Sequence, residues 1–283
     1  GFNLVWSGNH KEVVEISPFG RVRVQTGMND YQLNYELKPG EKLVAPEAVM
    51  VYAKEEKTVT NQMHKFILNH IINPNFAYKD RPVLINNWEG TYFDFTGDKI
   101  YEIAEKAASC GIEMLVLDDG WFGVRNSDDC SLGDWVDNVE KTGGLKNLAD
   151  RIKSLGMKFG LWFEPEMVNP DIDLYKAHPD WAMTTDKYTP AQGRNQLTLD
   201  LTRDDVVEYL INTMTDVFRY GNIEYIKWDC NRQFTDVFSR RKDARSGEFF
   251  HRYMMGLYEI WGALTEKFPN ILFEACSSGG NRF

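Results

Sequence analysis

The feature that most constrains this chain is a strand–loop–helix unit that repeats from Arg81-Pro82 onward. Strands that alternate with helices form parallel βα units, and strands that are apolar throughout are buried on both faces. Six units before residue 283 predict an α/β fold, a (β/α)8 barrel of TIM type interrupted after about six strands, since a whole barrel takes about 250 residues. An open doubly wound sheet is the alternative. The predicted strands are 83–87, 113–117, 158–163, 196–200, 224–228 and 271–274, and the predicted helices lie near 97–109, 144–155, 171–177, 203–220 and 249–267.

Residues 1–80 have a different pattern of apolar residues and turn signals. Short alternating runs at 22–25 and 49–52 are separated by turn signals such as Ser17-Pro18 and Lys38-Pro39-Gly40, which predicts antiparallel β-structure. A helical pattern over 62–72 then leads to the next part. We therefore expect two units, residues 1–80 and residues 81–283. The chain starts at Gly1 without a Met and stops soon after a predicted strand, so we expect an internal piece of a longer protein.

Composition excludes several classes of protein. The formal charge is −10, from 32 Lys plus Arg against 42 Asp plus Glu, which argues against nucleic acid or an anionic membrane as a partner. No apolar run approaches the ~20 residues of a membrane span. The 4 cysteines show no Cys-x-x-Cys spacing, so we expect reduced thiols and a cytoplasmic location. No Gly-x-Gly-x-x-Gly motif follows the first strand, which disfavours a dinucleotide site.

Carboxylates follow five of the six predicted strands. In a parallel barrel the carboxyl ends of the strands form the active-site face. We therefore expect these side chains to converge there, with Glu166 and Glu274 being structural. The full set is Asp118, Asp119, Glu164, Glu166, Asp200, Asp229 and Glu274.

Two triplets point to the chemistry. Lys227 and Asp229 share a strand face, and a neighbouring ammonium would keep Asp229 ionised, as a nucleophile must be. The alternative is a plain structural ion pair. Trp162 is expected to point inward, where its ring can pack on a sugar, or else to be core. Trp88 and Trp121 also follow strands and add aromatic side chains to this rim.

A rim of ionised acids and Trp suits a neutral polyol that gains positive charge in an oxocarbenium-like transition state. The rival chemistry is a divalent metal held by Asp118, Glu164 and Asp229 in a barrel lyase, but Lys227 would then sit beside the cation. We expect no cofactor and no metal.

Five motifs in order resemble glycoside hydrolase family 36, the retaining α-galactosidases, over roughly residues 80–283. They are Asp118-Asp119-Gly120-Trp121-Phe122-Gly123, residues 161–168 (Leu-Trp-Phe-Glu-Pro-Glu-Met-Val), Gly193-Arg194-Asn195-Gln196, residues 227–232 (Lys-Trp-Asp-Cys-Asn-Arg) and Cys276-Ser277-Ser278-Gly279-Gly280. Residues 1–80 are similar to the end of the family's N-terminal β-sandwich with its linker helix.

The resemblance implies a role for each matching residue. Asp229 would be the nucleophile that forms a covalent galactosyl-aspartate. Asp118 and Asp119 would bind the galactose 4- and 6-hydroxyls, and Arg194 and Lys227 would also bind hydroxyls. The remaining candidates are Trp162 lining the pocket, Trp88 closing it, and Asn231, Cys276 and Gly279 near the 2-hydroxyl.

The family's acid/base Asp lies in a later motif that nothing here matches, so we expect this chain to hydrolyse galactosides such as melibiose and raffinose feebly. Asn281 and Cys230 depart from the family pattern, which commonly has Gly and Met there. The resemblance suggests a homotetramer. Alternatives are a transglycosylating or α-N-acetylgalactosaminidase relative, and a non-catalytic galactoside-binding barrel.

Overall fold

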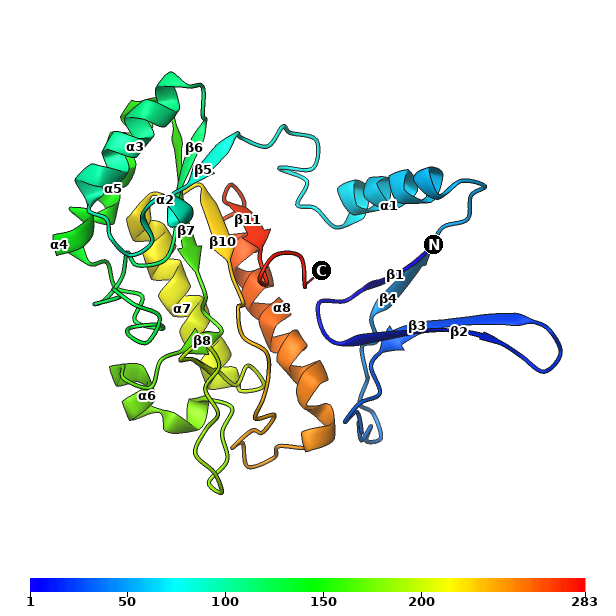
Figure 1. The fold of residues 1–283 in the computed structure, drawn as a ribbon. Coiled ribbons are helices and arrows are strands. Elements are labelled where there is room, and N and C mark those ends of the chain that lie inside the picture. The colour runs from blue at the N-terminus through cyan, green and yellow to red at the C-terminus, as the bar shows by residue number, and fades with distance from the viewer. Residues whose placement is uncertain (283) are drawn as a thin grey trace.

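The computed structural model describes residues 1–282, and its centre is a five-stranded parallel sheet (Figure 1). The strand order is β11-β10-β7-β6-β5, and every neighbouring pair is parallel. The strands are β5 (Leu84–Asn86), β6 (Met114–Leu117), β7 (Lys158–Phe163), β10 (Tyr225–Trp228) and β11 (Leu272–Ala275). Central β6 and β7 are almost wholly buried, as apolar strands of a covered parallel sheet must be. The predicted β/α barrel type is confirmed.

Four long helices follow the strands and pack in the order α3, α5, α7, α8 along the sheet (Figure 1). They are α3 (Gly97–Ser109), α5 (Leu145–Ser154), α7 (Asp204–Gly221) and α8 (Phe249–Lys267); shorter turns are α2 (Trp88–Thr91), α4 (Val139–Thr142) and α6 (Asp173–Ala177). In α3, Ile100, Ala104 and Ala107 form the buried stripe, and the Thr96 side chain caps the helix by accepting from Lys99 N at 3.2 Å. The predicted long helices agree with these bounds.

The predicted strand at 196–200 does not join the parallel sheet, so that assignment was wrong. Its centre is β9 (Leu197–Thr198), which pairs antiparallel with β8 (Met167–Val168). Strand β10 pairs directly with β7 instead, with Tyr225 opposite Gly160. The physical reason is that Leu197 and Leu199 are buried beside the loop after β7, and burial in a short antiparallel pair gives the same apolar pattern as burial in a parallel sheet.

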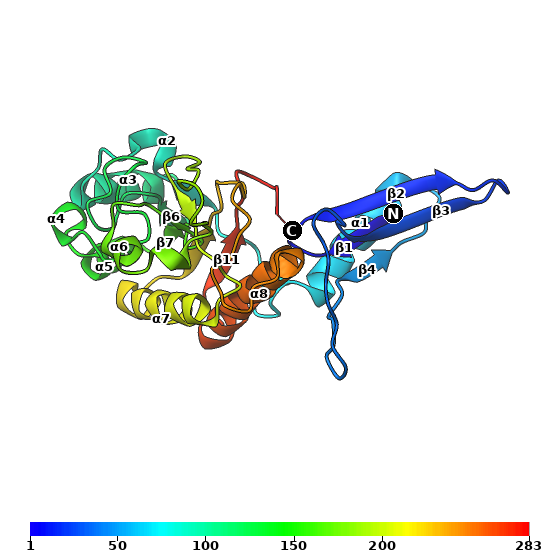
Figure 2. The same cartoon turned by 90° about the horizontal axis from the view of Figure 1, so that it is seen from below.

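Residues 1–80 form small antiparallel sheets and one helix, as expected. Strands β1 (Phe2–Val5) and β4 (Glu47–Met50) pair with each other, and β2 (His10–Ile16) pairs with β3 (Val22–Met28) in a hairpin. The hairpin points away from the parallel sheet (Figure 2). Helix α1 (Glu56–His70) begins before the predicted residue 62, because its N-terminus has no side-chain cap to mark it in the sequence.

This N-terminal part rests on α8. The Trp6 ring stacks on His251 with centroids 5.8 Å apart and meets Tyr258 edge-on at 5.6 Å. His251 Nε2 also hydrogen-bonds Val44 O at 2.9 Å. The contact is an aromatic cluster with few buried neighbours from residues 1–80, so most of the hydrophobic core lies around the parallel sheet. Within residues 1–282 no helix combines the length and hydropathy needed to cross a membrane.

Candidate active site

The carboxyl end of β6 carries a buried carboxylate, Asp118, that is tied to two other strands. Its Oδ2 accepts from Lys227 Nζ of β10 at 2.9 Å and from Asn86 Nδ2 of β5. The direct ion-pair partner of Lys227 is therefore Asp118, whereas the sequence analysis paired it with Asp229. Burial lowers the pKa of Lys227, but Asp118 outweighs burial and leaves the pKa above its usual value.

Asp119 lies next to Asp118 and forms a second buried pair, with Arg125. The guanidinium donates to both carboxylate oxygens, from Nε to Oδ1 at 3.0 Å and from Nη2 to Oδ2 at 2.8 Å. Arg125 is 1% exposed, and although burial opposes its charge, Asp119 holds its pKa above the usual value. Sequence reasoning missed Arg125; the one available signal was a cation six positions after an acidic strand end.

Asp229 follows β10 and is held by donors on several sides. Trp162 Nε1 donates to Oδ2 at 3.0 Å, and Cys230 N donates to Oδ1 at 2.9 Å. Burial raises the pKa of Asp229, but hydrogen bonds from Asn231, Trp162, Cys276 and the Cys230 amide outweigh burial and hold the pKa below its usual value. Asp229 is therefore an ionised carboxylate in a nearly solvent-free setting.

The three tryptophans have different positions. Trp162 lies near the end of β7, is 3% exposed, and is parallel to Phe122 with centroids 6.4 Å apart. Trp121 is fully buried, and its Nε1 donates to Trp162 O at 3.0 Å, so the expectation that it belongs to the rim was wrong. Gly120 has φ +106°, and the chain reverses there and returns Trp121 to the core. Trp88 is half-buried in α2 and reaches the cluster through Asn86, which accepts from Trp88 N.

The remaining candidates sit on three loops at the same edge. Arg194 occupies the tip of a turn, and its side chain is 47% exposed. Asn231 Oδ1 accepts from Ser278 Oγ at 3.0 Å, which links the loop after β10 to the loop after β11. That second loop carries Cys276 and Gly279, the latter at φ +97°.

Glu164 is a buried carboxylate at the end of β7 that touches both neighbouring loops. One oxygen accepts from Asn231 N, and the other accepts from Gln196 Nε2 at 3.1 Å. Burial, reinforced by the charge of Asp229, raises the pKa of Glu164 to about 7. The sequence marked Glu164 as a strand-end acid but gave no hint of this burial.

The other strand-end acids have structural contacts. Glu166 is fully buried and accepts from Trp228, Tyr253 and Arg282, in agreement with the expectation of a structural role. Asp200 lies after β9, outside the parallel sheet, and caps its own turn by accepting from Thr202 N at 3.0 Å. Within residues 1–282, no group of three or more His, Cys, Asp or Glu side chains is placed to hold a metal ion. The set considered for a metal, Asp118, Glu164 and Asp229, does not form such a group.

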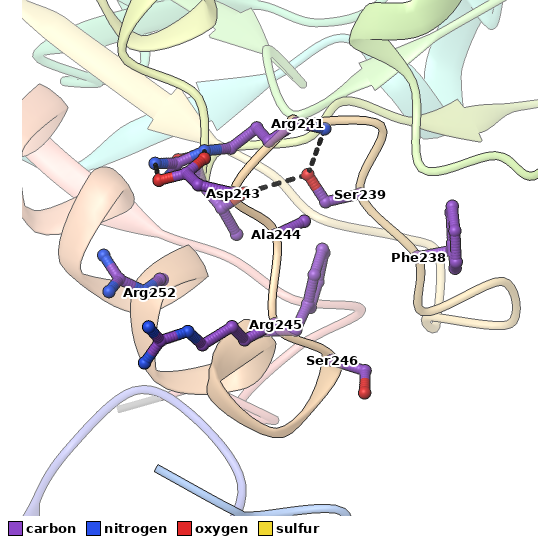
Figure 3. A pocket seen from close by; sticks show the side chains of 10 residues that line it. Phe238, Ser239, Arg241, Asp243, Ala244, Arg245, Ser246 and Arg252 are labelled. Atoms are coloured by element: carbon purple, nitrogen blue, oxygen red, sulfur yellow. Dashed lines mark hydrogen bonds and ion pairs between the residues drawn. The ribbon is translucent and has the colours of Figure 1, made fainter. Parts of the chain in front are cut away.

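Two cavities help to locate the site. One of about 450 Å³ is lined by two of the candidates, Arg194 and Asn231, and by Cys230, the chain neighbour of Asp229. Another of about 250 Å³ lies against the loop before α8 and contains none of them (Figure 3). Its arginines already have carboxylate partners, as Arg241 has in Asp243 at 2.9 Å, so this second cavity is not the candidate site.

A parallel β/α sheet whose carboxyl edge carries an ionised carboxylate, two further carboxylates paired with Lys227 and Arg125, and an indole ring has the features of a barrel-type glycoside hydrolase site. The comparisons agree with that class. The Melibiase family matches residues 43–283, and the Glycosyl hydrolase family 36 N-terminal domain matches residues 1–38. The chain belongs to glycoside hydrolase family 36.

Its relatives are α-galactosidases. The chain is 46% identical to AgaA of Geobacillus stearothermophilus and 45% identical to Mel36A of Lactobacillus acidophilus, covering 100% of this chain and 39% of each relative. The chain thus spans about 39% of the length of the curated relatives it matches. The crystal structure of AgaA superposes with a TM-score of 0.96 over 100% of this chain and 40% of that one. Variants of AgaA have been crystallised with raffinose and with stachyose.

Proposed function

We propose that this chain carries the galactose-binding half of a retaining exo-α-galactosidase, with Asp229 as the nucleophile. The observation that carries the proposal is the state of Asp229: a depressed pKa, donors to both carboxylate oxygens and almost no exposure to solvent. An ionised carboxylate of this kind can attack an anomeric carbon and form a covalent galactosyl-aspartate.

The other candidate residues have positions that suit binding of hydroxyls. Asp118 with Lys227 and Asp119 with Arg125 are assigned to the galactose 4- and 6-hydroxyls. Arg194 reaches in from its exposed turn, and Trp162 lines the sugar. Asn231, Cys276 and Gly279 are assigned to the 2-hydroxyl, and Trp88 to closure of the pocket.

A retaining mechanism needs two carboxyl groups about 5–5.5 Å apart, one as nucleophile and one as acid/base. We assign the acid/base carboxyl to sequence outside residues 1–283, because no motif here resembles that of the family. General acid help is typically worth about 10²–10⁴-fold, so this chain alone should turn over ordinary galactosides poorly.

The substrates proposed are terminal α-galactosides of the melibiose and raffinose type, for which the AgaA complexes with raffinose and stachyose are the support. We propose residues 1–80 and 81–283 as the two structural units and a homotetramer as the assembly of the whole protein. A cytoplasmic location is consistent with four cysteines that are all unpaired.

The test is covalent labelling with 2-deoxy-2-fluoro-α-galactosyl fluoride, followed by intact mass and peptide mapping. Fluoride leaves with little acid help, so the reagent reports on Asp229 alone. We expect one adduct on Asp229 and none in Asp229→Asn, with circular dichroism confirming that both are folded. A folded wild-type chain that takes no label would refute the proposal; galactose binding without label would then favour the non-catalytic binding protein.

The rate at which the label is lost from Asp229, and the reagent that labels it, distinguish the remaining enzymatic alternatives. If hydrolysis is the reaction, adding galactose as an acceptor should not speed the loss of the label from Asp229. Faster loss with galactose would favour a transglycosylating relative. Labelling by 5-fluoro-N-acetyl-α-galactosaminyl fluoride, whose fluorine leaves carbon 2 free for the acetamido group, and not by the galactosyl reagent would favour an α-N-acetylgalactosaminidase.

A further inference from the structure

The turn that presents Arg194 has an unfavourable backbone conformation. Arg194 and Asn195 have φ of 53° and 60°, and the flanking residues Gly193 and Gln196 hydrogen-bond each other in both directions, at 3.2 and 3.0 Å. Positive φ at both central residues is the geometry of a tight two-residue hairpin, and non-glycine residues hold it only when neighbours fix the turn.

One neighbour that fixes this turn is Asn169, a fully buried side chain after β8. Its Nδ2 donates to Asn195 O at 2.7 Å and to Asp128 O at 3.3 Å. Its Oδ1 accepts from Leu132 N at 2.7 Å and from Arg125 Nη1 at 3.2 Å. The amide therefore uses both donors and both acceptor sites, which is the full capacity of an asparagine.

These four contacts join the two sides of the candidate site. Arg125 donates to Asn169 through Nη1 and to the Asp119 carboxylate through Nε and Nη2. Asn195, which Asn169 holds by its carbonyl, is the chain neighbour of Arg194. We propose that Asn169 is a positioning residue that fixes Arg194 and Asp119 relative to each other. The inference rests on the proposed function, in which both of those residues bind galactose hydroxyls.

The chemistry of an amide explains why this position holds Asn. Asparagine presents donors to two carbonyl oxygens and an acceptor to a guanidinium in one planar group. The substitution Asn169→Asp keeps the shape of the side chain but turns its donor side into an acceptor that faces the carbonyl oxygens of Asn195 and Asp128. The turn would then lose its hydrogen bond from residue 169 to Asn195 O, while the volume of the side chain stayed almost the same.

The experiment measures labelling of Asp229 by 2-deoxy-2-fluoro-α-galactosyl fluoride as a function of reagent concentration. In Asn169→Asp we expect the half-saturating concentration of the reagent to rise roughly tenfold or more, as loss of hydrogen bonds to buried polar groups would give. The labelling rate at saturation should stay within a factor of about two, because the donors to Asp229 do not contact Asn169.

Asn138→Ala is the matched control. Asn138 also ties one loop of this region, by donating to Gly123 O at 2.8 Å and accepting from Lys141 N at 3.0 Å, but its side-chain hydrogen bonds reach neither Arg125 nor the Arg194 turn. The substitution should lower thermal stability and leave both labelling constants unchanged. Asn169→Ser, smaller and uncharged, replaces Asn169→Asp if the latter does not fold.

The outcomes separate the two proposals. A wild-type half-saturating concentration in a folded Asn169 variant would overturn the positioning role alone, and so would an equal loss in Asn138→Ala. A wild-type chain that takes no label would overturn the proposed function and the role of Asn169 with it.

Discussion

Replacing Glu164 by Gln should change how the stability of this chain depends on pH. Glu164 is 1% exposed and accepts one hydrogen bond from Asn231 N and one from Gln196 Nε2. A Gln at this position still accepts from Asn231 N. Its new NH₂ group can be met by rotating the amide of Gln196, whose Oε1 has no partner within residues 1–282. The substitution therefore removes the charge and keeps the contacts.

The magnitude follows from the pKa of Glu164, which burial raises from 4.5 to about 7. An acid with a raised pKa in the fold binds its proton more tightly folded than unfolded. Its stabilising effect is therefore complete below about pH 4.5 and is lost as the pH rises to about 7. At about 1.4 kcal/mol per pH unit, the wild type should lose about 2–3 kcal/mol of unfolding free energy between pH 5 and pH 8 through this group alone.

The assay is urea unfolding of both proteins at a series of pH values from about 5 to 8 at constant ionic strength. The stability of Glu164→Gln minus that of the wild type should grow by about 2–3 kcal/mol over this range. Glu208→Gln, which removes an exposed carboxylate from α7, controls for the loss of one charge. A stability difference that stays constant with pH would refute the assignment of a buried, proton-binding Glu164.

Three further predictions rest on other contacts. Trp162→Phe removes a donor to Asp229, so the pKa of Asp229 should rise. In a plot of labelling rate against pH, the fall at low pH should then begin at a higher pH than in the wild type, and an unchanged curve would contradict this. Gly256→Ala should cost at least about 1–3 kcal/mol in urea unfolding, because its Cβ would overlap Leu201 O, whereas Gly262→Ala in the same helix meets open space and should gain about 0.5–1 kcal/mol. Glu166→Ala leaves the buried Arg282 guanidinium without its partner and should cost about 3–5 kcal/mol; a loss under about 1 kcal/mol would show that Arg282 finds water instead.

The helices could be predicted well because their signals are local. In α3 the cap at Thr96 and the buried spacing of Ile100, Ala104 and Ala107 lie within one segment of the chain. The strand at 196–200 was wrong because a strand is defined by its partner. Leu197 and Leu199 report burial only, and nothing in the segment says that β8 rather than β7 lies beside it.

The same distinction holds for the candidate site. The motifs pointed to the strand ends that the structure brings together, because the direction of parallel strands puts all carboxyl ends at one edge. The sequence did not predict which side chains form ion pairs across this edge. Lys227 pairs with Asp118, which is 109 residues away in sequence, and not with its neighbour Asp229. Arg125 had only a weak signal in the sequence, its position six residues after an acidic strand end, and Asn169 had none, because their importance lies in burial and hydrogen bonding, which residue type and spacing do not encode.

The two roles of Trp162 limit which substitutions could change the substrate preference of such a pocket. One indole ring is assigned to the proposed sugar site and also donates to Asp229 through Nε1. A substitution at this position changes the shape of the proposed pocket and also the pKa of Asp229, the proposed nucleophile, so substrate preference and reactivity cannot change independently there. Variation in specificity has a freer path through the exposed Arg194 turn, where a new side chain leaves the donors to Asp229 intact. Directed evolution for new sugars should accordingly accumulate its first changes at the exposed Arg194 and retain the ring at 162.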